Sequence, residues 1–318
     1  MTPLGTMRED SSGSQDVRRE HGFALILVIW MLALLALLGA EVAADSRSAA
    51  VVSRSRLDRM QLQASADAGV TLAVMGLLDP VVAARWQADG RIYNRQYAGR
   101  SLAIIIEDEG GKIDVNTAPI ELIAGLLNEF GVDRKQKALI TQAILDRRAQ
   151  FMSAAPVPSS NTGRIFGQSH VINLAKLAFA DVSELRLLPG MTRSLYQGLE
   201  PEITVYSQNP TINPMTASRP TLLAIPGTGT GDAEAVMASR SDGSTQLNAE
   251  ELSKLALYAR VDTLHVVSIT ARASLPDGAS FTRRAVVAVS PDRPLEPTRI
   301  LRWEQPADLS PGNEISLR

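Results

Sequence analysis

The residues best suited to chemistry are four carboxylates grouped around a pair of glycines. They are Glu107, Asp108, Glu109 and Asp114. Calcium takes about six to eight oxygen ligands, and carboxylates on a flexible loop can supply them. The spacing is not that of an EF-hand loop, so a solvated turn between a strand and a helix is the simpler interpretation of the same residues. Other candidate metal ligands, which the sequence supports no better, occur later in the chain: Asp232, Glu234, Asp242 and Asp262.

No set of residues suggests catalysis. The three histidines are too scattered for a zinc site, and the sequence contains neither a nucleophile elbow nor an HExxH helix. The chain has no cysteine, so no disulfide can stabilise it. Its net charge of −2 gives no general attraction to nucleic acid. We therefore expect a protein that is not an enzyme.

An apolar stretch near the N-terminus must organise the rest of the chain. Residues 23–40 carry no charge. At about 1.5 Å per residue, a helix of this length spans about 27 Å, close to the ~30 Å hydrocarbon core of a bilayer. We therefore expect a transmembrane helix over residues 23–44. Basic residues precede this run and acidic residues follow it, which predicts a cytoplasmic N-terminus and an external domain.

The helix is expected to continue well beyond the apolar run. No proline interrupts residues 41–79, and apolar side chains recur there at a spacing that predicts one apolar side. The proline after Asp79 ends or kinks this helix. A group of small residues lies within it: Ala64, Ala66, Ala68 and Gly69. Small side chains let a second helix approach closely, so this part of the helix favours helix–helix contacts.

Strand patterns occur in two places that are far apart in the sequence. Residues 91–97 and 101–107 flank a turn at Ala98-Gly99, and residues 261–275 and 280–290 flank Pro-Asp-Gly. Helical patterns separate the two pairs, with helices expected near 117–130 and 133–148. The sequence therefore predicts one small antiparallel sheet that is interrupted by an inserted helical domain.

This reading divides the chain into six parts. They are a leader (1–22), the transmembrane part of the helix (23–44), a helix with the first strands (45–109), the inserted helical domain (110–250), the last strands (251–290) and a proline-rich tail (291–318). The fold class is α+β.

A short repeat lies within the predicted insert. The sequence IDVNTA at residues 113–118 is echoed by INPMTA at residues 212–217. Two turns, LRLLPGMT at 185–192 and LLAIPGTG at 222–229, also resemble each other, and each has the form of a helix-hairpin-helix turn. Such turns often bind DNA phosphates with help from lysine and arginine. Few basic residues lie nearby, so a packing module without a ligand is favoured.

The N-terminal region resembles a type IV pilin-like precursor. In that family a prepilin peptidase cleaves after a glycine and methylates the new N-terminal phenylalanine, which here implies cleavage between Gly22 and Phe23. The usual glutamate at the fifth mature position is replaced by Leu27. Pseudopilin K of the type II secretion system characteristically lacks this glutamate. The segments EGGKIDVNTAP, ELRLLPGMT and INPMTAS are also similar to pseudopilin K.

This resemblance implies a pilin-like fold, in which a long N-terminal transmembrane helix packs on a small antiparallel sheet, with a helical domain inserted. It implies a minor pseudopilin at the tip of the periplasmic pseudopilus, which initiates assembly and supports export of folded proteins across the outer membrane. The implied partners are the I and J minor pseudopilins, H, the major pseudopilin, the prepilin peptidase and the inner membrane. Calcium binding in the external domain is implied as well. No nucleic acid is expected.

Leu27 has a specific consequence at the tip. In pilin-like filaments the buried glutamate at this position pairs with the terminal amine of the adjacent subunit, because an unpaired charge at bilayer depth costs about 2.5–3.5 kcal/mol. A leucine cannot neutralise that amine, so no subunit is expected above this one. Two alternatives stay open: a membrane-anchored helix-hairpin-helix protein for DNA binding or uptake, and a minor pilin of a type IV pilus.

Overall fold

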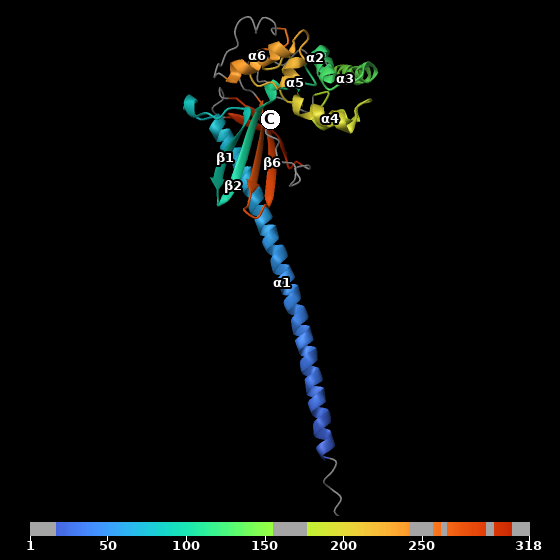
Figure 1. The fold of residues 1–318 in the computed structure, drawn as a ribbon, viewed down its shortest axis with the longest axis vertical. Coiled ribbons are helices and arrows are strands. Elements are labelled where there is room, and N and C mark those ends of the chain that lie inside the picture. Colours follow the sequence, from blue (N-terminus) through green and yellow to red (C-terminus); the bar gives the residue numbers. More distant parts are fainter. Residues whose placement is uncertain (1–16, 155–176, 242–256, 262–265, 291–295, 307–318) are drawn as a thin grey trace, which may run out of the picture. The chain divides into compact units, whose positions relative to one another are not determined.

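A computed structural model describes residues 17–154, 177–241, 257–261, 266–290 and 296–306 (Figure 1). The chain divides into two compact units, Met1–Gln61 and Leu62–Arg318. A single helix, α1 (Val17–Leu77), runs through the boundary between them.

Within the first unit, α1 exposes a continuous run of large apolar side chains. Phe23 is 71% exposed, Leu27 is 56% exposed and Trp30 is 74% exposed. The prediction that one helix continues past the apolar run is confirmed, because α1 has 61 residues without a break. Among the helices of the described residues, none combines the length and apolar character required to cross a membrane. The spanning segment over residues 23–44 stays a prediction.

The second unit contains a five-stranded sheet in which every neighbouring pair is antiparallel. Its strands, in spatial order, are β1 (Asp89–Tyr97), β2 (Arg100–Asp108), β5 (Val266–Ser274), β6 (Ser280–Val289) and β7 (Thr298–Glu304). The predicted sheet is confirmed, and strands distant in sequence, β2 and β5, lie side by side in it. The predicted proline-rich tail (291–318) contains one strand of this sheet, because β7 lies within it.

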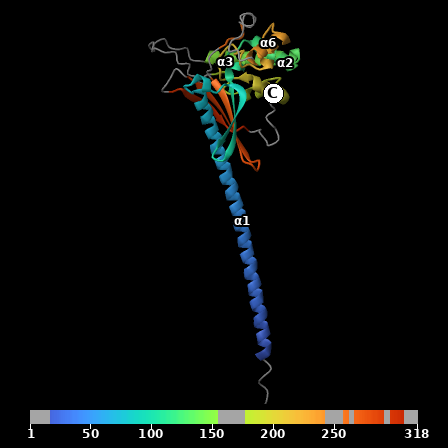
Figure 2. The ribbon, with the colours of Figure 1, turned by 60° about the vertical axis from the view of Figure 1, so that its left-hand side comes forward.

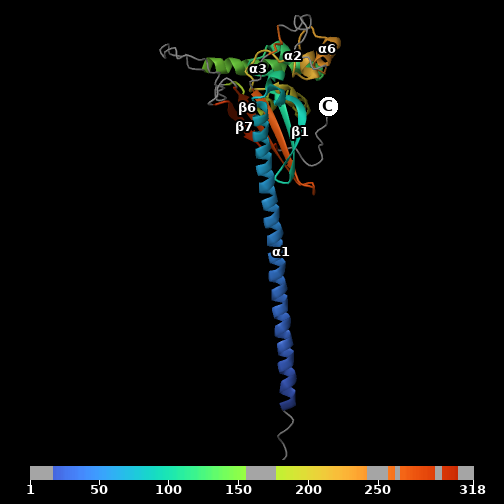
Figure 3. The ribbon, with the colours of Figure 1, turned by 90° about the vertical axis from the view of Figure 1, so that its left-hand side faces the viewer.

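The C-terminal end of α1 packs against one face of this sheet (Figure 3). Its buried residues recur every three or four positions, which places them on one side of the helix; they are Leu62, Ala66, Val70, Ala73 and Leu77. The helix lies close to the sheet because Gly69 has no side chain. A Cβ at that position would be 2.9 Å from the Cβ of Ala271 on β5.

Between β2 and β5 the chain forms a helical insert. Figures 1 and 2 show its helices gathered at one end of the sheet. In chain order the elements are η2 (Glu109–Gly111), β3 (Ile113–Asp114), α2 (Ile120–Glu129), α3 (Arg134–Ala154), η4 (Val182–Leu187), α4 (Arg193–Leu199), η5 (Glu200–Glu202), β4 (Ile203–Thr204), α5 (Arg219–Leu223) and α6 (Thr230–Ser241). A further short helix, η1 (Val82–Ala84), lies between α1 and β1.

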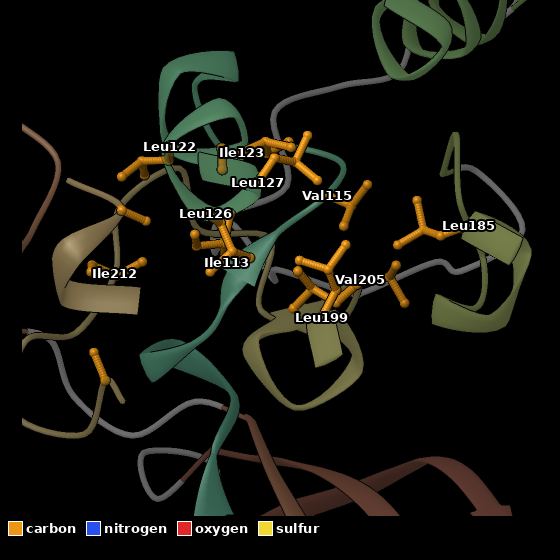
Figure 4. Close-up of a cluster of buried hydrophobic side chains, with 14 of the residues drawn as sticks. Ile113, Val115, Leu122, Ile123, Leu126, Leu127, Leu185, Leu199, Val205 and Ile212 are labelled. Carbon is orange, nitrogen blue, oxygen red and sulfur yellow. The ribbon is translucent and has the colours of Figure 1, made fainter. Parts of the chain in front are cut away.

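The insert has a hydrophobic core of its own (Figure 4). Ile113 and Leu122 from the first half of the insert and Ile212 from the second half are almost completely buried in it. Aliphatic side chains fill most of this core, as the low aromatic content of the sequence (4%) requires. The sheet side of α1 belongs to a separate cluster, and Val266 of β5 and Val286 of β6 extend the insert's core onto the sheet.

Candidate functional site

The predicted carboxylate group lies where the sheet passes into the insert, at the end of β2. Asp108 caps η2 by accepting a hydrogen bond from the backbone N–H of Gly110. Its second oxygen accepts from the Asn213 side-chain amide at 2.9 Å and from the Thr216 hydroxyl at 2.8 Å. Burial raises the pKa of Asp108 above its ordinary value, although these hydrogen bonds oppose the shift. Asp108 therefore fixes the second half of the insert to the end of the sheet.

Glu109 and Lys112 form a buried ion pair beside Asp108. The Lys112 ammonium lies 2.7 Å from a Glu109 carboxylate oxygen. Glu109 also accepts a hydrogen bond from Thr204 on β4. Burial alone would raise the pKa of Glu109, but the charge and hydrogen bond of Lys112 outweigh it, so this pKa is lowered. Burial opposes the charge on Lys112 too, yet Glu109 and Glu107 raise its pKa. Both groups are therefore charged inside the junction.

Asp114 accepts four hydrogen bonds and is almost completely buried. One oxygen accepts from the backbone N–H groups of Asn116 and Thr117, which closes the turn before α2. The other accepts from the hydroxyl of Ser207 and the backbone N–H of Gln208. Burial raises the pKa of Asp114, against the effect of these bonds. The side chain is thus an internal acceptor that joins two distant segments.

These carboxylates do not fit a calcium site. The oxygens of Asp108, Glu109 and Asp114 already accept hydrogen bonds from protein groups or form ion pairs with them. The fourth carboxylate, Glu107, differs from them because its side chain is 48% exposed. Within the described part of the chain, no group of three or more His, Cys, Asp or Glu residues could hold a metal ion. Asp232 accepts from the N–H of Gly229 and Glu234 faces Arg219. Residues 242 and 262 lie outside the described residues. Calcium binding stays a prediction.

The small residues of α1 do not share one environment. Ala66 and Gly69 are buried against the chain's own sheet, Ala68 is half-buried and Ala64 is exposed. The assignment of Ala66 and Gly69 to contacts with a partner is therefore corrected, because their small size serves the close approach of α1 to β5. Only Ala64 and Ala68 keep surface that another helix could reach.

The predicted processing site lies in the first turns of α1. Gly22 and Phe23 are helical. Phe23 and Leu27 are both exposed, and neither residue belongs to a buried cluster of the chain. Cleavage between Gly22 and Phe23 and the role of Leu27 at the tip stay predictions.

The predicted repeat has a common local structure. The side-chain oxygen of Asn213 in the second segment accepts a hydrogen bond from the backbone N–H of Met215. Asp114 in the first segment accepts one from the N–H of Asn116 in the same way. An arginine from a later helix then donates to two carbonyl oxygens of each segment. Arg148 of α3 donates to Val115 and Ala118, and Arg240 of α6 donates to the corresponding residues, Pro214 and Ala217.

The sequence analysis did not predict either arginine. The number of residues between the arginine and its repeat segment differs in the two halves, so no common spacing indicates them.

The two hairpin turns have the glycine conformation that the sequence predicts. Gly190 has φ = 85° and Gly227 has φ = 84°, in the left-handed region that favours glycine. Two nearby arginines have internal partners, since Arg186 lies over the Tyr196 ring and Arg219 lies near Glu234, whereas Arg193 in the first turn of α4 is exposed. This arrangement favours packing over phosphate binding. Assignment of these turns to helix-hairpin-helix modules stays a prediction.

Comparison with known proteins gives matches for the sequence and for the fold. Residues 100–208 match the family model of "Type II secretion system (T2SS), protein K", its first domain. This range begins with β2 and includes the carboxylate junction and the first part of the insert. The matched segment is similar to this family. No curated protein matches the chain. The predicted resemblance to pseudopilin K is confirmed by this match.

A solved structure supports the same fold. The chain is similar to a chain in the crystal structure of the GspK–GspI–GspJ complex of the type 2 secretion system of enterotoxigenic Escherichia coli. The TM-score is 0.52 at 16% identity, and the similarity covers 80% of this chain and 99% of the other. At this identity the likeness establishes the fold alone. The chain therefore shares its fold, a helix with an antiparallel sheet and a helical insert, with that solved chain.

Proposed function

We propose that this chain is the minor pseudopilin K of a type II secretion system. The match of residues 100–208 to the protein K family carries the proposal. Such a subunit belongs to an assembly of related subunits, and the similar chain comes from a complex with GspI and GspJ. The I and J minor pseudopilins are therefore the proposed partners of this chain.

The exposed apolar half of α1 supports anchoring in the inner membrane. Among the described residues, its large apolar side chains from Phe23 to Leu38 are exposed, Phe23 and Trp30 by more than two-thirds. Placing them in lipid removes this apolar surface from water. On this proposal the N-terminus is cytoplasmic, the second unit is periplasmic and prepilin peptidase produces a mature chain that starts at Phe23.

Two features support the proposed tip position. Leu27 supplies no carboxylate for the amine of a neighbouring subunit, and the insert adds bulk that a small pilin-like sheet lacks. A chain at the tip has no subunit above it and therefore needs neither the carboxylate nor free space there. We propose that this chain begins the pseudopilus and remains at its end while folded proteins are exported.

Replacement of the gene in its own bacterium tests the function. Deletion is expected to abolish export of the secreted proteins, and the wild-type gene is expected to restore it. Mass spectrometry of the restored chain is expected to find N-methylated Phe23 at the N-terminus. The variant Gly22→Val is expected to keep its leader and to fail in export. Gly39→Val is the matched control, because a Cβ there meets no atom within 4 Å.

Normal export in the deletion strain would contradict the proposal, and so would a mature chain that retains its leader.

A further inference from the structure

The strand β7 contains a bulge that directs its side chains to both faces of the sheet. It lies beside β6 at one end of the strand order (Figure 3). Ile300 is paired with Val287 of β6. Two residues later, Arg302 is paired with Val286, the residue next to Val287 along β6. Leu301 is therefore the extra residue of a β-bulge, a feature that changes the direction of the neighbouring side chains.

Leu301 and Arg302 both contact the insert. Leu301 packs against the hydrophobic core of the insert, and Val286, opposite Arg302, is buried in the same core. The Arg302 guanidinium forms an ion pair with Asp181, the residue that caps η4. It also donates a hydrogen bond to the Tyr206 hydroxyl at 3.0 Å. The strand thus holds two segments of the insert, one before α4 and one after it.

The next residue, Trp303, lies on the face that α1 covers. It is paired with Ala285, which is completely buried in the cluster under α1. The Arg283 guanidinium lies over the Trp303 ring, 5.2 Å from its centre. The Nε of Arg283 is 2.6 Å from a carboxylate oxygen of Asp67 on α1, and the Arg283 side chain is only 9% exposed. β7 therefore reaches α1 through one intermediate side chain that is fixed between a ring and a carboxylate.

The strand itself is held less firmly than its neighbour. Every residue of β7 is at least partly exposed, whereas most of β6 is buried. A segment with few buried apolar contacts opens at a lower free energy than the core of the same protein. The contacts that β7 makes with the insert and with α1 therefore contribute much of the stability of its docked state.

We propose that β7 is a strap that couples the insert to α1. The strand docks on β6 as one unit, and its docked state is stabilised by Asp181 from the insert and by Asp67 from the helix. Two sites that stabilise the same state of one element are energetically coupled, and this coupling is reciprocal. A change at Asp181 alters how firmly β7 holds Arg283 beside α1, and a change at Asp67 alters how firmly β7 holds the insert. This inference goes beyond the proposed function and does not depend on it.

Thiol labelling on the two faces of β6 in the full-length chain tests this coupling. The chain has no native cysteine, so one introduced cysteine is its sole thiol. Ala285→Cys reports on the face under α1, opposite Trp303, and Val286→Cys reports on the insert side, opposite Arg302. Both positions are buried while β7 is docked, so the labelling rate follows local opening.

Each substitution is made on one face and its effect is measured on the other. Asp181→Asn keeps a side chain that can cap η4 but removes the charge that faces Arg302. It is expected to speed labelling of Ala285→Cys about threefold, since the ion pair is partly exposed. Asp67→Asn is expected to speed labelling of Val286→Cys by a similar factor. Acceleration that is confined to the face of the substitution would overturn the proposal.

Asp133→Asn is the matched control for the substitution in the insert. Asp133 also precedes a helix of the insert, α3, and accepts hydrogen bonds from the backbone N–H groups of Lys135 and Gln136. An asparagine can accept the same bonds, so both labelling rates are expected to stay unchanged. An effect equal to that of Asp181→Asn would mean that any altered cap loosens β7, and this too would overturn the strap.

Hydrogen exchange of the full-length chain without a reporter cysteine gives a second measurement. Asp181→Asn and Asp67→Asn are each expected to speed exchange of the β7 amides about threefold along the whole strand, because the strap opens as one unit. Exchange that is unchanged, or that is faster only next to the altered contact, would overturn the proposal. This measurement decides the question even if a reporter cysteine disturbs the fold.

Discussion

The segments at residues 113–118 and 212–217 have the same turn but differ at their second residue. Asp114 occupies this position in the first segment and Asn213 in the second. In both, one side-chain oxygen accepts a backbone N–H two residues later. The difference lies in the other terminal atom. Asp114 accepts there from Ser207 and Gln208, whereas Asn213 donates there to Asp108.

The surroundings of that second atom explain the choice between acid and amide. Two donors face Asp114, so a carboxylate oxygen satisfies them and an amide N–H₂ would not. A buried carboxylate faces Asn213, so an amide satisfies it and a second carboxylate would repel it. Each half of the insert thus keeps the turn of the repeat and adapts one atom to its neighbour. The first half is fixed to the segment around residue 207, and the second half to the end of β2.

The largest loss of stability is expected from a substitution where the two halves of the insert are in contact. A Cβ on Gly125 of α2 would lie 2.0 Å from the carbonyl oxygen of Ala224, next to α5. Gly125→Ala therefore forces the two backbones apart and is expected to lower the free energy of unfolding by about 3 kcal/mol. Urea unfolding of the purified chain, followed by circular dichroism, measures this loss.

Gly231→Ala in α6 is the control for that substitution. A Cβ at Gly231 meets no atom within 4 Å, and alanine favours the helix over glycine by about 0.5–1 kcal/mol. The control is expected to unfold at equal or higher urea concentration. Equal destabilisation by both variants would mean that the halves do not depend on close contact at Gly125.

Exchange of the two side chains tests the comparison directly. Asp114→Asn turns an amide N–H₂ towards two donors, and Asn213→Asp turns a carboxylate towards Asp108. Each is expected to cost about 2 kcal/mol of unfolding free energy at neutral pH, since a buried group loses its partner. Urea unfolding at several pH values separates the two variants.

The pH dependence of these variants follows from the direction of the pKa shifts. Burial raises the pKa of Asp108 above 3.8, and a second carboxylate beside it would raise this pKa further. A carboxyl group whose pKa is higher in the folded than in the unfolded protein stabilises the fold fully at pH values below its unfolded pKa. This contribution to stability is lost as the pH rises through its folded pKa. The defect of Asn213→Asp is therefore expected to shrink as the pH is lowered into this range. A defect that grows on acidification would contradict the proposed contact between the two carboxylates.

Local patterns predicted those parts of the molecule that depend on neighbouring residues in the sequence. The turn at Ala98-Gly99, the continuous helix up to Leu77 and the repeat at Asp114 and Asn213 were all indicated by short-range spacing. The internal partners of the carboxylates at residues 107–114 could not be predicted, because some of them, such as Thr204, lie about a hundred residues away. Strand β7 was missed because prolines surround it, and its pairing with β6 does not show in its own sequence.

The smallest expected effect concerns the arginine that closes each half. Arg240 donates to the carbonyl oxygens of Pro214 and Ala217, and burial lowers its pKa to about 10. Lysine keeps the charge, but its compact ammonium lacks the planar fork that reaches both oxygens. Arg240→Lys is therefore expected to lose one hydrogen bond and about 1 kcal/mol of unfolding free energy.

Arg148→Lys is expected to have an effect of the same size, because Arg148 donates to the equivalent carbonyls of the first segment. Arg134→Lys, at an exposed position of α3, is the matched control and is expected to unfold like the wild type. If Arg148 and Arg240 act equivalently and independently, the variant that carries both lysines loses the sum of the two single losses of unfolding free energy. A loss well below that sum would mean that the two halves open as one unit, and that their shared contact at Gly125, more than either arginine, determines the stability of the insert.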